Sequence, residues 1–385
     1  MIDLTADRFW LLAGVAVLAL SPCHDRRRRQ WIFAMANAAC LGMLAGVGIV
    51  VASGLATAAL ALALRCRQRH ARTSVVVLSA ATLLFAFHKT RGFGVPAELA
   101  GVPLLRWLGA VSFSYVFLRV WSVVKLHDPA TGAPSPMALY NYLYPFHMLA
   151  AGPIQSWPDH VAAGDTGPPA DRSVIALGIE RIVRGLFKKY VLAWILAQLV
   201  AGGWNYGSPW LKLAEINGHY IWIFLDFSAY SDIAVGLGLL LGRPAPENFR
   251  NPLGARNLVE FWERWHITLS QFIRTHAFFP IQVGLLRRFG RRRQVACAAL
   301  ASLAAFTLCG LWHAFSLRYL AWGAFHGAGL AMFLFWRALL QGRWGETGWK
   351  RWQNRPLVLA FGRILTFEFV AFSLHLIAGN WSPQW

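Results

Sequence analysis

The sequence predicts an all-α, polytopic integral membrane protein with about 9–11 membrane helices, including re-entrant or interfacial segments, around a central tunnel. Hydrophobic residues make up 57% of the 385 residues and charged residues only 14%, whereas charged residues make up about 25% of an ordinary soluble domain. The apolar residues fall into runs long enough to cross a bilayer, and short basic clusters separate these runs. Because the connecting loops are short, we expect one membrane-embedded domain over residues 1–385.

Three basic clusters carry much of the formal net charge of +20; they lie at Arg26 to Arg29, Arg65 to Arg72 and Arg287 to Arg293. Basic residues between spans mark the cytoplasmic side of a membrane protein and attract anionic lipid headgroups. The charge therefore predicts membrane lipids, and not nucleic acid, as partners. The five cysteines lack metal-ligand or redox spacing, so we expect no metal site and no bound cofactor.

The N-terminal part, residues 1–101, contains three apolar runs: Phe9 to Ser21, Trp31 to Leu64 and Val75 to Phe87. The first run has neither the basic leader nor the small-residue cleavage site of a signal peptide, so we expect an uncleaved span. The second run is too long for one ordinary span and has a basic cluster at each end. We therefore expect it to turn back near Ser53 and Gly54 and to form two short helices.

The central part, residues 102–327, begins with a span at Val102 to Val124 and continues into a segment interrupted by Pro145 and Pro153. Proline breaks a membrane helix, and irregular backbone at membrane depth is tolerated only where it is buried in protein or lines a cavity. His147 lies in this broken segment. It is either a buried structural histidine or a residue that contacts substrate.

A basic amphipathic helix follows and leads into a span at Tyr190 to Val200. Its basic residues recur at spacings that place most of them on one face; they are Arg181, Arg184, Lys188 and Lys189. Basic side chains where a span begins usually extend toward lipid headgroups. The alternative is that this face recruits an anionic acyl donor.

The next span, Tyr220 to Leu241, contains two carboxylates, Asp226 and Asp232. A carboxylate at membrane depth has to be paired, protonated or exposed to water. We expect both residues to line the tunnel or to form structural polar contacts, and we favour the structural role over a catalytic one.

Residues Asn251 to Ile281 form an amphipathic stretch in which charged side chains alternate with Phe and Trp. Such a helix lies at the membrane interface or re-enters partway, so His266 would line a cytoplasmic entrance. Three apolar runs follow, at Ala296 to Trp312, Tyr319 to Leu340 and Pro356 to Ala378. We group residues 328–385 as the C-terminal spans.

His313 lies at the end of the first of these runs, about 25 Å along its helix, and should therefore reach the deeper half of the membrane. A lone histidine in an apolar helix is more often structural than catalytic. Here, however, His266 and His326 also fall in the last third of the chain, together with a broken helix and buried carboxylates. Neutral imidazole is well suited to accept and return a proton near pH 7, and ionisable residues at membrane depth are usually functional.

Several motifs follow one another in a fixed order through the central part. They are AAGPI (Ala150 to Ile154), RIVRGLFKK (Arg181 to Lys189), DFSAYSDIAVGLGLLLG (Asp226 to Gly242), PENF (Pro246 to Phe249), FWERWHITLS (Phe261 to Ser270), GLWHA (Gly310 to Ala314) and WGAFHG (Trp322 to Gly327). In this combination the chain resembles the membrane-bound O-acyltransferase superfamily, specifically the bacterial branch of alginate O-acetyltransferases and teichoic acid D-alanyl transferases.

The resemblance implies that His313 is the catalytic histidine and that His266 is a second catalytic position. We expect His313 to deprotonate an acceptor hydroxyl, which attacks the carbonyl of an acyl thioester such as acetyl-CoA or an acyl-carrier protein. Trp312, Asn248 and Ser270 are candidate oxyanion donors, and His326 is a further polar residue of the tunnel.

The donor is expected to enter from the cytoplasm, past His266 and the basic face. The acceptor on the outer side would be an exopolysaccharide, a cell-wall glycan, or a periplasmic or secreted partner protein that passes the acyl group on. The predicted location is the bacterial inner membrane, which the chain crosses several times.

Three alternatives remain open from the sequence. A polysaccharide or lipid transporter or export subunit would use buried carboxylates and broken helices equally well. A haem or metal protein would use His266, His313 and His326 as ligands. A family member without activity would serve only as an assembly subunit.

Overall fold

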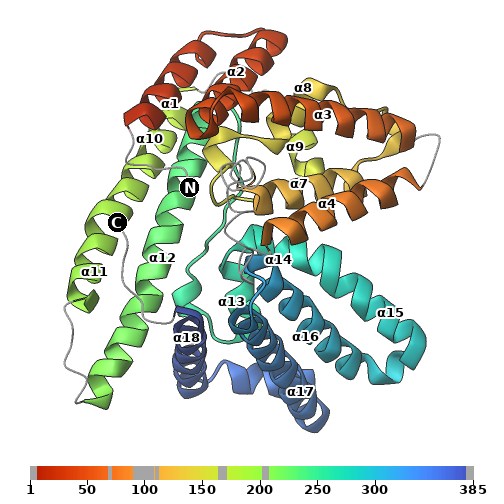
Figure 1. The fold of residues 1–385 in the computed structure, drawn as a ribbon. Helices are drawn as coiled ribbons and strands as arrows, with labels where there is room; N and C mark the ends of the chain where they lie inside the picture. The colour runs from red at the N-terminus through yellow and green to blue at the C-terminus, as the bar shows by residue number, and fades with distance from the viewer. Residues whose placement is uncertain are drawn as a thin grey trace. The chain divides into compact units, whose positions relative to one another are not determined.

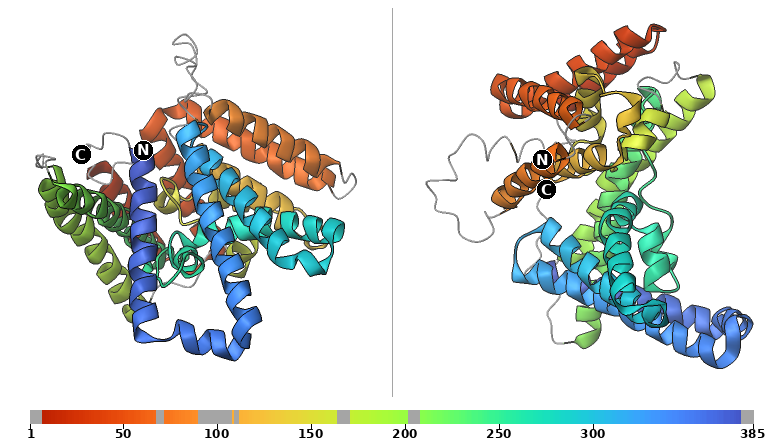
Figure 2. Two further views of the ribbon diagram at one scale, coloured as in Figure 1. Left: turned by 90° about the horizontal axis from the view of Figure 1, so that it is seen from below. Right: turned by 90° about the vertical axis from the view of Figure 1, so that its right-hand side faces the viewer.

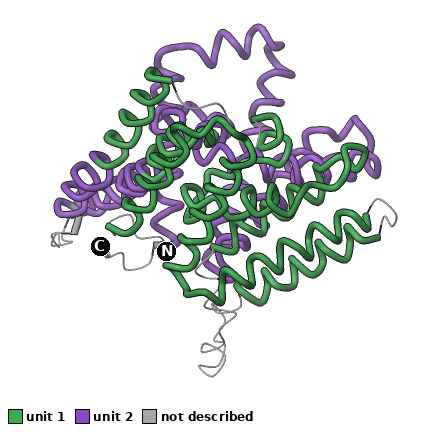
Figure 3. The backbone as a smooth tube through the Cα atoms, turned by 90° about the horizontal axis from the view of Figure 1, so that it is seen from above, with its two compact units in different colours: residues 1–186, 230–246 green, residues 187–229, 247–385 purple. Residues whose placement is uncertain are grey.

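The computed structural model describes residues 7–67, 72–89, 108, 112–163, 171–201 and 208–378 (Figure 1). The described residues form helices and connecting loops, with no strand among them, which confirms the predicted all-α class. The chain divides into two compact units, one of residues 1–186 and 230–246 and the other of residues 187–229 and 247–385 (Figure 3).

Unit 1 contains eight described helices before the chain passes to unit 2: α1 (Asp7–Leu20), α2 (Arg26–Ala45), α3 (Val47–Arg67), α4 (Thr73–Lys89), α7 (Phe113–Leu126), α8 (Pro136–Leu143), α9 (Trp157–Ala162) and α10 (Arg172–Phe187). The last turns of α12 (Pro209–Leu240) also belong to it. Its core is apolar and includes Phe9, Phe33 and Phe146. The predicted span at Val102 to Val124 is described only at residue 108 and from residue 112 onward.

The long apolar run at Trp31 to Leu64 is divided into two helices, but the prediction that it turns near Ser53 and Gly54 is wrong. The break falls at Gly46, whose φ of 81° suits glycine and separates α2 from α3. Ser53 instead lies inside α3, where its hydroxyl donates to the Val50 carbonyl at 2.9 Å. Hydropathy marks the run as too long, but the backbone conformation decides where the chain turns.

The broken segment predicted around Pro145 and Pro153 is confirmed. Helix α8 ends at Leu143, and a single 3₁₀ turn, Phe146–Met148, precedes extended backbone. The carbonyl groups that this break leaves without helical partners are bonded by Arg119, which is 1% exposed. Its guanidinium donates to the carbonyls of Leu143 at 3.3 Å and Met148 at 2.9 Å, as buried irregular backbone requires.

Unit 2 contains α11 (Trp194–Ala201), the first part of α12, and then α13 (Leu258–Arg264), α14 (Ile267–Ile273), α15 (Phe279–Phe289), α16 (Gln294–His313), α17 (Leu317–Gln353) and α18 (Pro356–Ala378). The amphipathic stretch Asn251 to Ile281 is therefore not one helix. It breaks at His266, whose φ is 41°, and a π-helical turn at Arg274–Phe278 then leads into α15. A non-glycine residue with positive φ is uncommon and often marks a functional position.

Helices α16 and α17 form a tightly packed antiparallel pair. A Cβ atom added to Gly310 would lie 2.1 Å from the Tyr319 carbonyl oxygen, and one added to Gly323 would lie 2.3 Å from that of Phe306. Backbone therefore contacts backbone, as small residues allow between membrane helices. Helix α17 bends at Gly345, where φ is 68°, before the chain turns into α18 (Figure 2).

Five helices among the described residues are long and apolar enough to span a membrane; they cover Val47–Arg67, Pro209–Leu240, Arg291–His313, Leu317–Gln353 and Pro356–Ile377. A shorter apolar helix covers Thr73–Lys89. Most other described helices are short or interrupted, as expected of re-entrant and interfacial segments. The chain is thus a multi-pass membrane protein.

Candidate active site

His266 lies between α13 and α14, and its ring is held by Asn248. The His266 Nδ1 and Asn248 Oδ1 atoms are 3.0 Å apart, and both residues are buried. The same Asn248 oxygen accepts hydrogen bonds from the Thr268 amide at 3.3 Å and the Thr268 hydroxyl at 2.9 Å. Because this oxygen is an acceptor, Nδ1 of His266 has to be the protonated ring nitrogen.

The other ring nitrogen of His266, Nε2, is therefore a free base. It is buried and has no hydrogen-bond partner among the residues that the structure describes. Burial lowers the pKa of His266 to about 3, and neighbouring His313 acts in the same direction, so the ring is neutral at physiological pH. A neutral, oriented imidazole with an unused lone pair is suited to accept a hydrogen bond from a reactant.

Aromatic rings enclose this imidazole. Phe227 of α12 meets it edge to face, with ring centroids 4.9 Å apart. Phe249 contacts both Phe227, at 5.0 Å, and Trp265, at 5.1 Å. The edge-to-face contact with Phe227, which Phe249 supports, helps to fix the position of the imidazole.

His313 is the last residue of α16, and its partly exposed ring is surrounded by three aromatic side chains. Its centroid lies 4.7 Å from Trp312, 5.9 Å from Tyr319 and 5.4 Å from Trp322. The close approach of α16 and α17 at Gly310 places Tyr319 and Trp322 against it. His313 belongs to the same unit as His266 and lies near enough to lower the pKa of that residue.

His326 has a different environment. It is 1% exposed, and its Nε2 lies 2.8 Å from the Ser373 hydroxyl of α18. Because that hydroxyl donates to the Val370 carbonyl at 2.7 Å, it accepts from His326 Nε2. His326 thus joins α17 to α18, while its ring packs against Trp322 with centroids 4.8 Å apart.

The carboxylates of α12 are paired with the basic residues that precede it. In unit 1, Asp232 accepts from Arg181 at 2.8 Å and from Arg184 at 3.3 Å. In unit 2, Asp226 pairs with Lys189. The fourth basic residue, Lys188, lies 3.4 Å from the Ser228 hydroxyl. These pairs satisfy the requirement for charge compensation at membrane depth.

The other candidate oxyanion donors, Ser270 and Trp312, lie near the two histidines, together with residues that the sequence did not single out. Ser270 donates its hydroxyl to the Trp265 carbonyl at 3.2 Å, whereas Trp312 packs directly on His313. Thr268 belongs to the same motif as His266 and could have been recognised from its spacing. Tyr319 lies in none of the motifs. Phe227 lies in the motif Asp226 to Gly242, but only the packing of separate helices brings these two side chains to the histidines.

No group of three or more His, Cys, Asp or Glu side chains that could hold a metal ion occurs in the part of the chain that the structure describes. Of the three histidines considered as metal or haem ligands, His266 faces Asn248 and His326 faces Ser373.

Comparison with known proteins places these histidines in a family context. The family model described as MBOAT, membrane-bound O-acyltransferase family, matches residues 73–374. That range contains the two histidines, their partners and the paired carboxylates.

Three curated relatives illustrate the similarity. The probable alginate O-acetylase AlgI of Pseudomonas putida is 30% identical over 231 residues, which cover 58% of this chain and 44% of the relative. The teichoic acid D-alanyltransferase of Bacillus subtilis is 24% identical over 288 residues, covering 72% and 70%. The peptidoglycan O-acetyltransferase of Helicobacter pylori is 31% identical over 164 residues, covering 41% and 29%. The chain thus spans less than half the length of the alginate O-acetylase that it matches.

Proposed function

Since the chain belongs to the membrane-bound O-acyltransferase family, we propose that it moves an acyl group from a cytoplasmic thioester donor to a hydroxyl of an extracytoplasmic polysaccharide or cell-wall glycan. The named activities of its relatives, O-acetylation of alginate and peptidoglycan and D-alanylation of teichoic acid, support this class of reaction. Acetyl is the acyl group we propose, because two of these three relatives are named for O-acetyl chemistry.

Two observations carry the proposal: His266 has a buried free lone pair on Nε2, and His313 lies at the end of α16, near enough to lower the pKa of His266. In the proposed reaction His313 takes the proton of the acceptor hydroxyl as its oxygen attacks the thioester carbonyl. The C–S bond then breaks, and the proton returns to the departing thiolate. Neutral His266 accepts a hydrogen bond and positions a reactant. Aromatic walls exclude water, which would otherwise hydrolyse the donor.

The donor is proposed to be acetyl-CoA or an acyl-carrier protein that approaches from the cytoplasmic side of the inner membrane. The basic clusters support this direction, because cytoplasmic loops carry the excess of Lys and Arg. The residues first proposed to attract the donor, Arg181, Arg184 and Lys189, are paired with Asp232 and Asp226. Their main proposed role is therefore to neutralise these carboxylates.

The acceptor is reached either directly or through a periplasmic or secreted partner that carries the acyl group further. A direct test uses membrane vesicles that contain the full chain, with acetyl-CoA carrying a labelled acetyl group and with a soluble polysaccharide added as acceptor. We expect the label to appear in an ester bond on the acceptor or on a protein of the membrane. Vesicles in which the donor is not consumed, while polysaccharide crosses the bilayer, would instead support the export alternative.

A further inference from the structure

A second site lies in unit 2, where α17 and α18 form a hairpin around the bend at Gly345 (Figure 2). An apolar pocket of about 650 Å³ opens between them. Its lining includes Met332, Trp336, Trp349, Trp352, Leu365 and Phe369. A cavity of this size and apolar character is typical of a ligand site, and it contains neither of the histidines of the candidate active site.

A polar cavity adjoins the apolar pocket. This second cavity has a volume of about 440 Å³ and shares Arg256 and Leu359 with the first. Its other charged lining residues are Glu260, Arg264 and Arg363. The two adjoining cavities are treated together as one space with an apolar end and a basic end.

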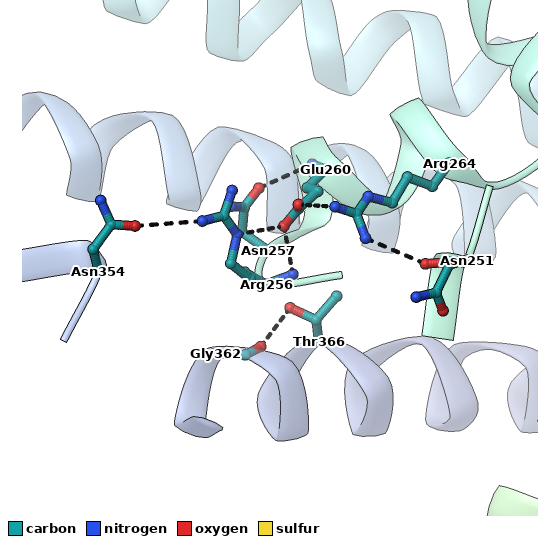
Figure 4. A network of polar contacts seen from close by, with 8 residues as sticks. All are labelled: Asn251, Arg256, Asn257, Glu260, Arg264, Asn354, Gly362 and Thr366. Atoms are coloured by element: carbon teal, nitrogen blue, oxygen red, sulfur yellow. Dashed lines mark hydrogen bonds and ion pairs between the residues drawn. The ribbon is translucent and has the colours of Figure 1, made fainter. Parts of the chain in front are cut away.

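The basic end has an excess of positive charge. Glu260 is held between two arginines (Figure 4): its carboxylate accepts from Arg256 Nε at 2.9 Å and from Arg264. Arg264 also donates to the Asn251 carbonyl at 3.3 Å. The cavity lining thus contains three guanidinium groups and one carboxylate, and the third arginine, Arg363 on α18, is exposed. Guanidinium groups recognise phosphate through paired hydrogen bonds.

The position of the bend indicates which lipid surface this space faces. Helices α17 and α18 are both candidate spans, so the bend between them lies at a membrane surface. Basic residues surround the bend, at Arg343, Lys350, Arg351 and Arg355, which marks the cytoplasmic side. The rings of Trp336, Trp344 and Trp349 all contact Trp352. Such tryptophans gather at the depth of lipid headgroups.

We propose that this space binds an anionic phospholipid of the cytoplasmic leaflet. One acyl chain lies in the apolar pocket among the tryptophans, and the headgroup phosphate lies against Arg363 and Arg256. The charge selects an anionic headgroup over a zwitterionic one, because basic pockets between spans attract such headgroups. The lipid holds α13, α17 and α18 together, and its binding is independent of acyl transfer.

The test uses the full chain purified in detergent and titrated with phosphatidylglycerol or phosphatidylcholine, with bound lipid counted by native mass spectrometry. We expect tighter binding of phosphatidylglycerol, and Arg363→Gln should weaken it by about fivefold, the effect of one basic residue near an anionic headgroup. Arg318→Gln, an exposed arginine in the first turn of α17 that lies outside both cavities and outside the three basic clusters, is the matched control and should leave binding unchanged.

A second variant tests the acyl-chain pocket. Met332 is 68% exposed and lines the apolar pocket, so Met332→Trp should narrow it without disturbing the fold and should reduce lipid binding. Equal binding of the two lipids, or equal losses in Arg363→Gln and Arg318→Gln, would overturn the proposal. So would undiminished binding of phosphatidylglycerol by Met332→Trp.

Discussion

The Asn248 side-chain oxygen lies 3.0 Å from His266 Nδ1 and fixes the imidazole in one tautomer. Because the same oxygen accepts two hydrogen bonds from Thr268, its orientation is determined by residues outside the imidazole. A single amide thereby leaves Nε2 of His266 as the free nitrogen. This contact and the helices around it should affect the rate of acyl transfer and the melting temperature of the protein.

Replacing Asn248 should impair the reaction more than it impairs folding. Asn248→Ala removes the acceptor of the His266 Nδ1 proton and leaves a buried donor unsatisfied, at a cost of about 1–3 kcal/mol. We expect the rate of acyl transfer to fall at least about tenfold, as measured with labelled donor in membranes. Thr268→Val removes one donor to Asn248 but keeps the His266 contact, so it should lose less. Equal losses in the two variants would contradict the positioning role.

Replacing the proposed base should abolish transfer. His313→Gln keeps a polar side chain of similar size but cannot take up the hydroxyl proton, so the rate should fall by at least about 100-fold. Protein level in the membrane should stay normal, because the His313 ring is only partly buried at a helix end. His24→Gln, at an exposed position before α2, serves as the control. Full activity in His313→Gln would show that another residue is the base.

The carboxylate of Asp232 should be important for stability. It is buried and pairs with Arg181 and Arg184. Asp232→Asn removes the negative charge of this buried ion pair, while Arg184 still contacts Glu180 at 3.3 Å, and should cost about 3–5 kcal/mol. Thermal unfolding of the purified protein would record this loss as a lower melting temperature. The exposed pair Lys350 and Glu346 is the comparison, because Lys350→Gln should change stability by less than about 1 kcal/mol.

The helix contact at Gly310 should not accept even one methyl group. A Cβ there would lie 2.1 Å from the Tyr319 carbonyl oxygen, so Gly310→Ala has to separate α16 from α17. We expect a lower melting temperature and reduced acyl transfer together, because His313 and Tyr319 move with these helices. Gly14→Ala in α1 meets no atom within 4 Å and should be neutral or slightly stabilising. A Gly310→Ala protein with normal stability would show that the two backbones can separate without cost.

Acid should weaken the cluster around Glu260. Burial alone would raise the pKa of Glu260, but hydrogen bonds from Arg256 and the charges of Arg256 and Arg264 outweigh it, so its pKa lies below the usual 4.5. A carboxylate with a lowered pKa contributes stability that is complete above its unfolded pKa and is lost as pH falls through the folded pKa. Melting temperature measured downward from pH 6 should therefore decline below about pH 4.5. Glu260→Gln should have a lower melting temperature at pH 6 and a smaller decline.

Hydropathy and proline placement predicted much of the fold. The helices that end near His313 and begin near Pro356 were expected from apolar runs, and the break around Pro145 from proline chemistry. The turn at Gly46 and the break at His266 were not, because each depends on one backbone torsion that apolar periodicity does not encode.

The site was predictable in its residue types but not in its partners. Charge compensation required partners for Asp226 and Asp232, but only the packing of the helices selects Lys189 for the first and Arg181 with Arg184 for the second. Likewise, the WHITLS motif draws attention to His266, while its contact with Phe227 joins residues far apart in sequence.

The glycines of α16 and α17 determine how precisely the His313 side chain is positioned. The backbones of the two helices are in direct contact at Gly310, Gly323 and Gly327. No side chains lie between the helices at these points, so changes of rotamer cannot let one helix slide along the other. The two helices therefore move as one rigid body. The orientation of the His313 imidazole, at the end of α16, therefore depends on three glycines, which have no side chains. A change in helix packing as far from the site as Gly327 would therefore alter the orientation of the His313 imidazole.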